Sequence, residues 1–236
     1  NVGEWTCSED GSVKTPPAAT APVALEWSTG FENRFCDYTE LAGFCYASDA
    51  ASYELVTAPV HHGRFAAAFK LTGEESSDAH TRCVRQGVLP AEAYYGAWYY
   101  VPSAPTKAVN WNLFHFRGGS AVTSTDGFLD VSLVNSNGSL RLAVYGRDYH
   151  PIGDAADSPP FRTERWIHVQ LFLKLRQGTN GGEVALYQDG NVVLDVAELS
   201  TNDSTYGQWY LGNLGSGLTP PDSTLYVDDV TISASL

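Results

Sequence analysis

The feature that most constrains the fold of this chain is a series of short apolar runs separated by residues that favour tight turns. Asn137-Gly138 and Asp189-Gly190 each join two such runs, and both residues of each pair tolerate the positive φ angles of a two-residue hairpin. The segment 179–182 has the composition of a third hairpin. The stretch 166–196 is therefore expected to form a three-stranded antiparallel meander.

Apolar and polar residues alternate within the runs, which is the pattern of a strand with one buried face. Every second residue from Ile167 to Leu175 is apolar, and the segments 129–133 and 140–144 repeat the pattern. We expect the polar rows of these strands to share one open sheet face. The sequence predicts no helix and eleven strands: 52–56, 64–71, 81–88, 95–101, 110–116, 128–134, 140–145, 166–175, 183–194, 209–211 and 225–232.

Many short antiparallel strands imply a β-sandwich or a barrel. Hydrophobic residues make up 43% of the chain and charged residues only 17%, which suits half-buried strands, and 236 residues suit a single all-β domain. We expect residues 25–236 to form one antiparallel β-sandwich of the jelly-roll kind. Residues 1–24 contain a Pro- and Ala-rich stretch and are expected to form an extended N-terminal spacer.

The four cysteines, Cys7, Cys36, Cys45 and Cys83, are widely spaced and include no Cys-x-x-Cys pair. Two disulfides are expected rather than a zinc site, with four buried thiols as the alternative. Three pairings are possible; the one we favour joins Cys36 to Cys45 and Cys7 to Cys83. Disulfides imply an oxidising compartment, so we expect a mature secreted, extracellular or cell-surface protein. No apolar run approaches the roughly 18 residues of a membrane helix, and no membrane insertion is expected.

The formal net charge of −13, with only 14 Lys and Arg residues, disfavours a nucleic-acid partner. An anionic polysaccharide would need basic residues gathered locally, whereas a neutral glycan or a bound cation would not. Two classes of hydrolase are disfavoured, because the chain lacks both a Gly-x-Ser-x-Gly elbow and a Glu-x-Asp-x-x-Glu strand. We expect a monomer.

The succession of segments along the chain resembles the heparin lyase I and glucuronan lyase type of jelly roll, within the concanavalin A-like lectin and glucanase superfamily. The segments that carry the resemblance are 63–69, 82–85, 95–102, 111–117, 166–169, 182–190 and 225–230. The resemblance implies β-elimination on uronic-acid polysaccharides, in which one group neutralises the carboxylate, a base removes the C5 proton and an acid protonates the leaving oxygen.

This chain departs from the lyase pattern at two of those roles. The central strand of such lyases carries Gln-x-His, and the matching segment here reads Leu113-Phe114-His115, so the histidine is present and the amide is not. Leu214 stands where a C-terminal Gly-x-Tyr would place its tyrosine. If the protein is a lyase, His115 is the catalytic candidate, with a nearby tyrosine as the alternative base and an arginine as the neutraliser.

Strand parity places Trp111, Leu113, His115 and Arg117 on one face, where indole, imidazole and guanidinium groups could bind a sugar. The other candidate ligand-binding residues are Arg82, Arg141, Tyr145 and Tyr187. In the aromatic cluster 94–100, one row is expected in the core and the other outward, and the sequence leaves open which is which. The alternative for each arginine is a surface ion pair with Asp or Glu.

Gly30-Phe31-Glu32 and Asp228-Asp229 resemble the pair of segments that, in many carbohydrate-binding jelly rolls, meet at the edge of the sandwich around a structural calcium ion. The resemblance implies Glu32 and Asp228 as the ligands, with Asp229 as the rival to Asp228. Carboxylate oxygens suit Ca²⁺. The alternative is that these residues face water.

Three functions follow from the sequence. The first is an extracellular polysaccharide-binding domain that holds a glycan on its concave sheet face, favoured because two lyase groups are missing. The second is a polysaccharide lyase that cleaves a uronic-acid polysaccharide by β-elimination. The third is an adhesion domain without a small ligand.

Overall fold

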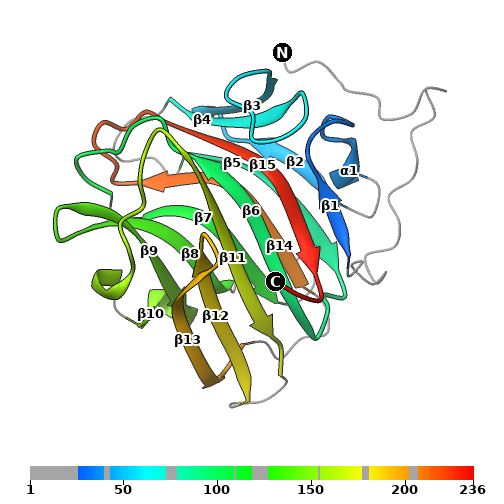
Figure 1. Cartoon of the computed structure of the whole chain (residues 1–236), viewed down its shortest axis with the longest axis vertical. Helices are drawn as coiled ribbons and strands as arrows, with labels where there is room; N and C mark the ends of the chain where they lie inside the picture. The colour runs from blue at the N-terminus through cyan, green and yellow to red at the C-terminus, as the bar shows by residue number, and fades with distance from the viewer. Residues whose placement is uncertain are drawn as a thin grey trace.

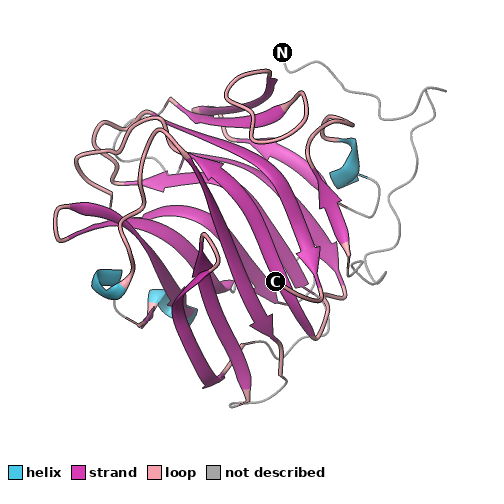
Figure 2. Cartoon of the chain, in the orientation of Figure 1, coloured by secondary structure: helices cyan, strands magenta, loops and turns pink. Residues whose placement is uncertain are grey.

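Two antiparallel sheets stack as a sandwich in the computed structural model of the chain (Figure 1). The structure describes residues 26–39, 43–72, 79–108, 110–118, 127–153, 155–176, 181–201 and 207–236. Figure 2 shows that strands make up nearly all the regular structure in this part of the chain. The predicted antiparallel jelly-roll sandwich is confirmed.

The first sheet has eight strands in the order β13-β12-β11-β6-β15-β4-β3, with β1 added beside β15. In chain order its strands are β1 (Trp27–Thr29), β3 (Ala51–Val56), β4 (Ala66–Leu71), β6 (Glu92–Tyr100), β11 (Trp166–Lys174), β12 (Gly182–Gln188), β13 (Asn191–Leu199) and β15 (Ser223–Ser233).

The second sheet has seven strands in the order β10-β9-β8-β7-β14-β5-β2. They are β2 (Phe44–Ala47), β5 (Ala79–Gly87), β7 (Asn110–Gly118), β8 (Gly127–Ser136), β9 (Ser139–Gly146), β10 (Pro151–Ile152) and β14 (Gly207–Ser216). The sequence missed the short strands β1, β2 and β10, and the single helical turns α1 (Cys36–Thr39), η1 (Arg147–Tyr149) and η2 (Ala155–Asp157). All six span four residues or fewer, too short for a periodic pattern.

The two predicted two-residue hairpins are confirmed. Asn137 and Gly138 have φ angles of 50° and 73° and join β8 to β9. Asp189 and Gly190 have φ angles of 52° and 77° and join β12 to β13. Strands β11 and β12 pair antiparallel as expected, although residues 177–180 of the third turn lie outside the described part.

The hydrophobic core lies between the sheets and contains the predicted apolar rows of β8, β9 and β11. Tyr95 and Tyr99 are fully buried there, which settles the orientation of β6: Tyr94, Trp98 and Tyr100 point outward. The expectation that the three polar rows share one face is wrong. Strands β8 and β9 belong to the seven-stranded sheet and β11 to the other, so their polar rows lie on opposite sides of the molecule.

Cys45 on β2 forms a disulfide with Cys83 on β5, with the two Cα atoms 4.0 Å apart. The favoured pairing of Cys36 with Cys45 is therefore wrong, because Cys45 and Cys83 face each other directly across two paired strands. Cys36 is also disulfide-bonded. Cys7 and the predicted spacer 1–24 lie outside the described residues.

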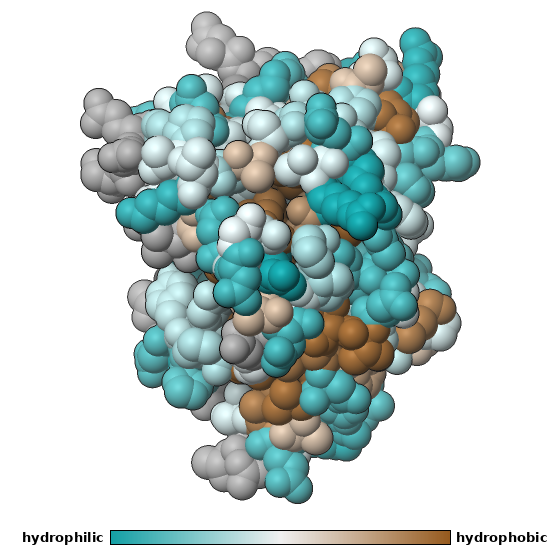
Figure 3. Space-filling model, turned by 60° about the vertical axis from the view of Figure 1, so that its left-hand side comes forward, coloured by the Kyte–Doolittle hydropathy of each residue, from teal (hydrophilic) through white to brown (hydrophobic). Residues whose placement is uncertain are grey.

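The surface on the side of β9 and β10 contains both hydrophilic and hydrophobic residues. Figure 3 turns this side toward the viewer and shows mostly hydrophilic residues with a hydrophobic patch in the lower half of the view. Among the described residues, no helix has the length and apolar character needed to cross a membrane.

Candidate functional site

A β-bulge in the central strand β7 decides which of its side chains face outward. Asn112 pairs with Ser132 of β8 and Phe114 pairs with Val131, so Leu113 is an extra residue without a partner on β8. An extra residue reverses the alternation of a strand. Leu113 and Phe114 both lie in the core, and Asn112 comes to the outer face with His115.

The bulge also moves Trp111 to the core, against the sequence expectation. Its side chain is fully buried between the sheets, and its indole N–H donates to Asn213 Oδ1 at 2.8 Å. Trp111 therefore does not share the face of His115 and offers a ligand no surface in this structure.

His115 lies at the centre of the outer face of the seven-stranded sheet, which we call the groove face. Strand register places Tyr210 of β14 opposite His115 on one side and Asp130 of β8 opposite it on the other. Farther out on each side, Tyr145 of β9 lies opposite Asp130, and Arg82 of β5 lies opposite Gly212 of β14. Residues from five strands thus meet on the groove face through the register of the strands and the bulge in β7.

His115 and Asp130 form a close pair. The ring atom Nδ1 of His115 lies 2.7 Å from Asp130 Oδ1, and both side chains are mostly buried. A carboxylate next to Nδ1 favours the tautomer with the proton on Nδ1, which leaves Nε2 as the nitrogen that can take a proton. Burial lowers the pKa of His115, and Asp130 partly opposes that effect. The imidazole is therefore neutral near pH 7, as a general base must be.

Asn112 links Asp130 to a buried arginine. Its Nδ2 donates to Asp130 Oδ1 at 2.6 Å and to the carbonyl of Phe114 at 2.9 Å, and its Oδ1 accepts from Nη2 of Arg82 at 2.8 Å. Arg82 is only 8% exposed. Its guanidinium also lies over the ring of Tyr210, 5.5 Å from the centroid. Burial lowers the pKa of Arg82 from a very high ordinary value, and the group stays cationic.

Tyr210 is held beside His115 by polar partners on both sides. Its hydroxyl donates to Gln208 Oε1 at 2.8 Å, and Nη1 of Arg117 approaches the same hydroxyl oxygen at 3.5 Å. The rings of Tyr210 and His115 meet edge to face with centroids 5.3 Å apart.

Two adjoining pockets hollow the groove face, and His115, Asp130 and Tyr149 line both. One, of about 290 Å³, is also lined by Arg82, Asn110, Asn112, Arg117 and Leu214. The other, of about 420 Å³, is also lined by Gly127, Gly146, Arg147 and Asp148. Cationic side chains lie in both pockets, within a protein of net charge −13. His115 is therefore at the middle of a groove rather than at its end.

Gly127 and Tyr149 shape the larger pocket. A Cβ on Gly127 would lie 2.4 Å from Cε1 of His115, so only glycine leaves room for the ring in this position. Asp148 and Tyr149 both have positive φ angles, 58° and 55°, and this turn leaves Tyr149 67% exposed beside the groove. Positive φ is unfavourable for a residue as large as tyrosine and is concentrated at functional sites.

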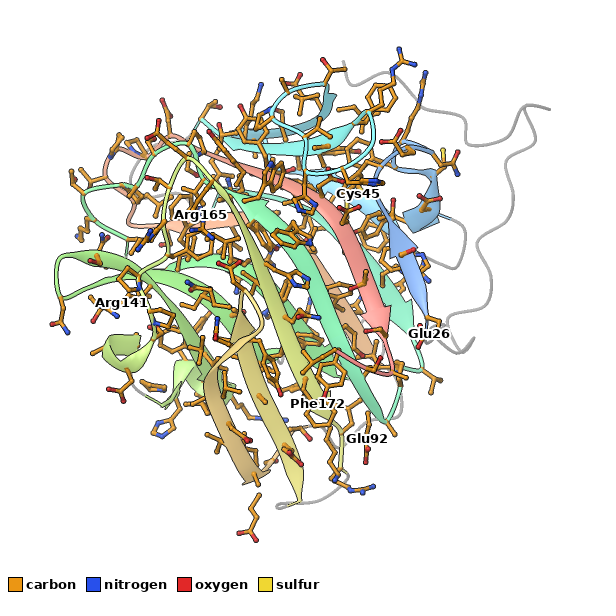
Figure 4. All side chains as sticks on the ribbon, viewed as in Figure 1. Glu26, Cys45, Glu92, Arg141, Arg165 and Phe172 are labelled. Atoms are coloured by element: carbon orange, nitrogen blue, oxygen red, sulfur yellow. A yellow bond between two sulfur atoms is a disulfide. The ribbon has the colours of Figure 1, made fainter. Side chains whose placement is uncertain are left out.

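The structure separates the remaining predicted ligand-binding residues. Tyr145 lies on the groove face opposite Asp130 but lines neither pocket. The guanidinium of Arg141 donates to the carbonyls of Ser136 and Ser158, so its contacts are structural, and it lies toward one end of the sheet (Figure 4).

Tyr187 belongs to the other side of the sandwich. It lies on the outer face of the eight-stranded sheet, with its ring centroid 6.2 Å from that of Tyr94, and Tyr94 in turn lies 5.0 Å from Phe172. Tyr187 faces outward, as expected, but on the sheet opposite to His115, because β12 and β7 are in different sheets.

Sequence reasoning missed Asn112, Asp130, Tyr149 and Tyr210 as site residues. Asp130 and Tyr210 lie in strands that were predicted, and their parity was readable, but only the register with β7 brings them to His115. Asn112 could not be found, because the bulge that turns it outward has no sequence signature in β7.

The predicted calcium ligands bind backbone amides in this structure. Glu32 Oε1 accepts from the N–H groups of Arg64 and Phe65, at 2.7 and 2.9 Å. Asp228 is fully buried, and its two oxygens accept from the N–H groups of His61, His62 and Asp229. N–H groups occupy positions where a cation would need oxygen atoms, and the described residues contain no cluster of three or more His, Cys, Asp or Glu suited to a metal. Calcium at this edge of the sandwich stays a prediction.

Comparison with known proteins identifies the architecture. No family model and no curated sequence matches the chain. Among solved structures, an endo-β-1,4-glucuronan lyase from the fungus Trichoderma reesei matches with a TM-score of 0.63 and 17% identity, over 80% of this chain and 90% of that one. An alginate lyase, Aly36B, in complex with an alginate trisaccharide matches with a TM-score of 0.62 and 16% identity, over 91% and 99% of the two chains.

The shared feature is the fold. A third structure, the cellulose-induced protein Cip1, matches with a TM-score of 0.62 and 14% identity, over 88% and 97% of the two chains. The jelly roll of this chain is thus that of glucuronan and alginate lyases, whereas none of these matches is to a heparin lyase. At such low identity the likeness extends to the fold alone.

Proposed function

We propose that this protein is a polysaccharide lyase that cleaves a uronic-acid polysaccharide by β-elimination on the groove face. The observation that carries the proposal is the cluster of Arg82, Asn112, His115, Asp130 and Tyr210, held together by direct contacts. It supplies a cation, a neutral base and a phenol on the groove face, where His115 and Arg82 line a pocket and Tyr210, only 5% exposed, lies beneath them. The sequence-based preference for binding alone rested on two missing groups; Arg82, positioned by Asn112, is a candidate for the neutraliser and Tyr210 for the acid.

Arg82 and Arg117, which line the same pocket, bind the uronate carboxylate. Neutralising that carboxylate makes the neighbouring C5 proton more acidic, since negative charge develops there as the proton leaves. Arg82 is the stronger candidate, because its mostly buried charge is little screened by water. Asn112 positions Arg82, since all of its own polar groups are engaged within the protein.

Nε2 of His115 removes the C5 proton of the uronate. The C5–H bond breaks, its electron pair forms the C4=C5 double bond, and the C4–O bond breaks. Asp130 is a positioning residue: it fixes the tautomer of His115 and stabilises the imidazolium that forms.

The hydroxyl of Tyr210 protonates the oxygen that leaves C4. Its edge-to-face contact with His115 places the two groups within the span of one sugar unit. Arg117 stabilises the phenolate that results. The elimination then balances without an oxidant, a reductant or a cofactor, because the proton lost from C5 and the proton gained by the leaving oxygen are exchanged with the protein.

The test is incubation of the protein with glucuronan, polymannuronate and polyguluronate while the ultraviolet absorbance of unsaturated uronic-acid ends is followed. We expect product from at least one polymer and a fall of at least about 10²-fold in kcat for His115→Ala and for Tyr210→Phe. His62→Ala is the matched control, since His62 has an exposed side chain away from the groove face. Retention of a polymer in affinity electrophoresis without any product would instead establish a binding domain.

A further inference from the structure

Phe44 on β2 is a solvent-facing aromatic residue at the edge of the groove face. Its side chain is 39% exposed, and it lines neither pocket. Nothing in the proposed chemistry at His115 requires it. An exposed aromatic ring offers an apolar face on which a ligand can pack.

Strand register aligns Phe44 with the reactive residues. Phe44 lies opposite Val84 of β5, Val84 opposite Tyr210 of β14, and Tyr210 opposite His115 of β7. Three strand spacings separate Phe44 from His115, which corresponds to about 14 Å across the sheet. One row that crosses four strands therefore leads from the proposed base to an exposed aromatic ring.

The disulfide shows which way Phe44 points. Cys45, the next residue, bonds to Cys83, which lies in the core, so Phe44 and Tyr46 on either side of it point to the groove face. The rings of Phe44 and Tyr46 are 5.6 Å apart, and Tyr46 in turn meets His80 at 5.4 Å. Phe44 is thus held by neighbours on a disulfide-linked strand.

We propose that Phe44 is the stacking platform of a distal sugar subsite for the same polysaccharide. This inference rests on the proposed function. The apolar face of a pyranose ring packs on an aromatic ring, and Phe44 carries no charge with which to bind a carboxylate. The polymer then crosses the strands from β7 toward β2, with its reacting unit at His115 and a later unit on Phe44.

The experiment compares long and short substrates in the Phe44→Ala variant. We expect KM for the polymer to rise about 3- to 10-fold with kcat nearly unchanged, because the ring adds binding remote from the reacting bond. KM for the shortest oligosaccharide that the wild type cleaves should not change, because its sugars do not extend as far as Phe44. Phe44→Tyr should keep the wild-type KM, and Val192→Ala, an exposed apolar residue on β13, is the matched control.

Equal KM values for wild type and Phe44→Ala on the polymer would overturn the inference, as would an equal rise on polymer and short substrate. If the wild type cleaves no uronan, the proposed function fails. Affinity electrophoresis on the same polymers then tests on its own whether Phe44 binds a sugar. Weaker retardation of Phe44→Ala than of the wild type would then support it, and equal retardation would refute it. Absence of retardation of the wild type by every uronan would overturn both proposals.

Discussion

At the scale of single residues, the pair His115 and Asp130 carries most of the proposed chemistry. Two effects act on the imidazole in opposite directions: burial lowers its pKa, and the hydrogen bond and charge of Asp130 raise it. Burial is the larger effect, so the pKa lies below the ordinary value of about 6.5. His115 was predictable as a candidate from its strand, whereas its carboxylate partner became visible only through the register of β7 and β8.

The residue-scale prediction concerns the variant Asp130→Asn. A base works only in its neutral form, so activity should be lost as pH falls through the pKa of His115, below about 6.5. Removing Asp130 removes the effects that raise this pKa, so the acid limb of the kcat profile should move to lower pH. We also expect kcat to fall by about 10²-fold, because the amide no longer fixes the tautomer. A pH profile of kcat for both proteins measures this, and an unchanged acid limb would exclude His115 as the base.

At the scale of elements, a bulge in β7 and two carboxylates beside the segment 61–65 fix the positions of neighbouring residues. The extra residue Leu113 places Asn112 on the groove face and Trp111 in the core. The segment 61–65 is held from two sides, by Glu32 after β1 and by Asp228 in β15, through backbone N–H groups. The sequence identified both carboxylates as notable and assigned them to a cation, because residue types alone do not reveal which groups face them.

The element-scale prediction is that Asp228→Asn destabilises the fold. The asparagine side chain places an N–H₂ group where a carboxylate oxygen accepts backbone N–H groups, and Asp228 is fully buried. A loss of about 1–3 kcal/mol in the free energy of unfolding follows. Urea denaturation measures it, with Asp222→Asn as the control, because Asp222 is exposed.

The same denaturation with added Ca²⁺ or a chelator tests the calcium prediction. Stabilisation by Ca²⁺ in the wild type that disappears in Asp228→Asn is the result this prediction requires. Equal stability of the wild type in Ca²⁺ and in chelator would rule out a stabilising calcium ion at this edge.

At the scale of the whole molecule, a protein of net charge −13 is proposed to bind a polyanion. Long-range repulsion and local attraction therefore oppose each other. The attraction comes from Arg82, Arg117 and Arg147 in the groove, and the most buried of them, Arg82, is little affected by salt. The repulsion acts between exposed charges over distances beyond the Debye length, which is about 10 Å at 0.1 M salt.

The whole-molecule prediction is that kcat/KM on the polymer rises severalfold as salt increases from about 0.01 M to about 0.15 M, because the repulsion is screened first. Initial rates at substrate concentrations well below KM measure this directly. A steady fall of kcat/KM over the same range would mean that the groove cations dominate approach of the substrate, and would contradict the expectation.

Alternation and turn chemistry within the sequence determined the longer strands, the Asn-Gly and Asp-Gly hairpins and the antiparallel sandwich, because these depend on neighbouring residues. They also identified Arg82, His115 and Arg117 as outward-facing candidates. Tertiary structure decided what they meet: which strands share a sheet, where the bulge at Leu113 reverses parity, and which cysteine faces Cys45. Each of these depends on pairing between segments far apart in the chain, and a one-residue shift in such pairing moves every side chain of a strand to the other face.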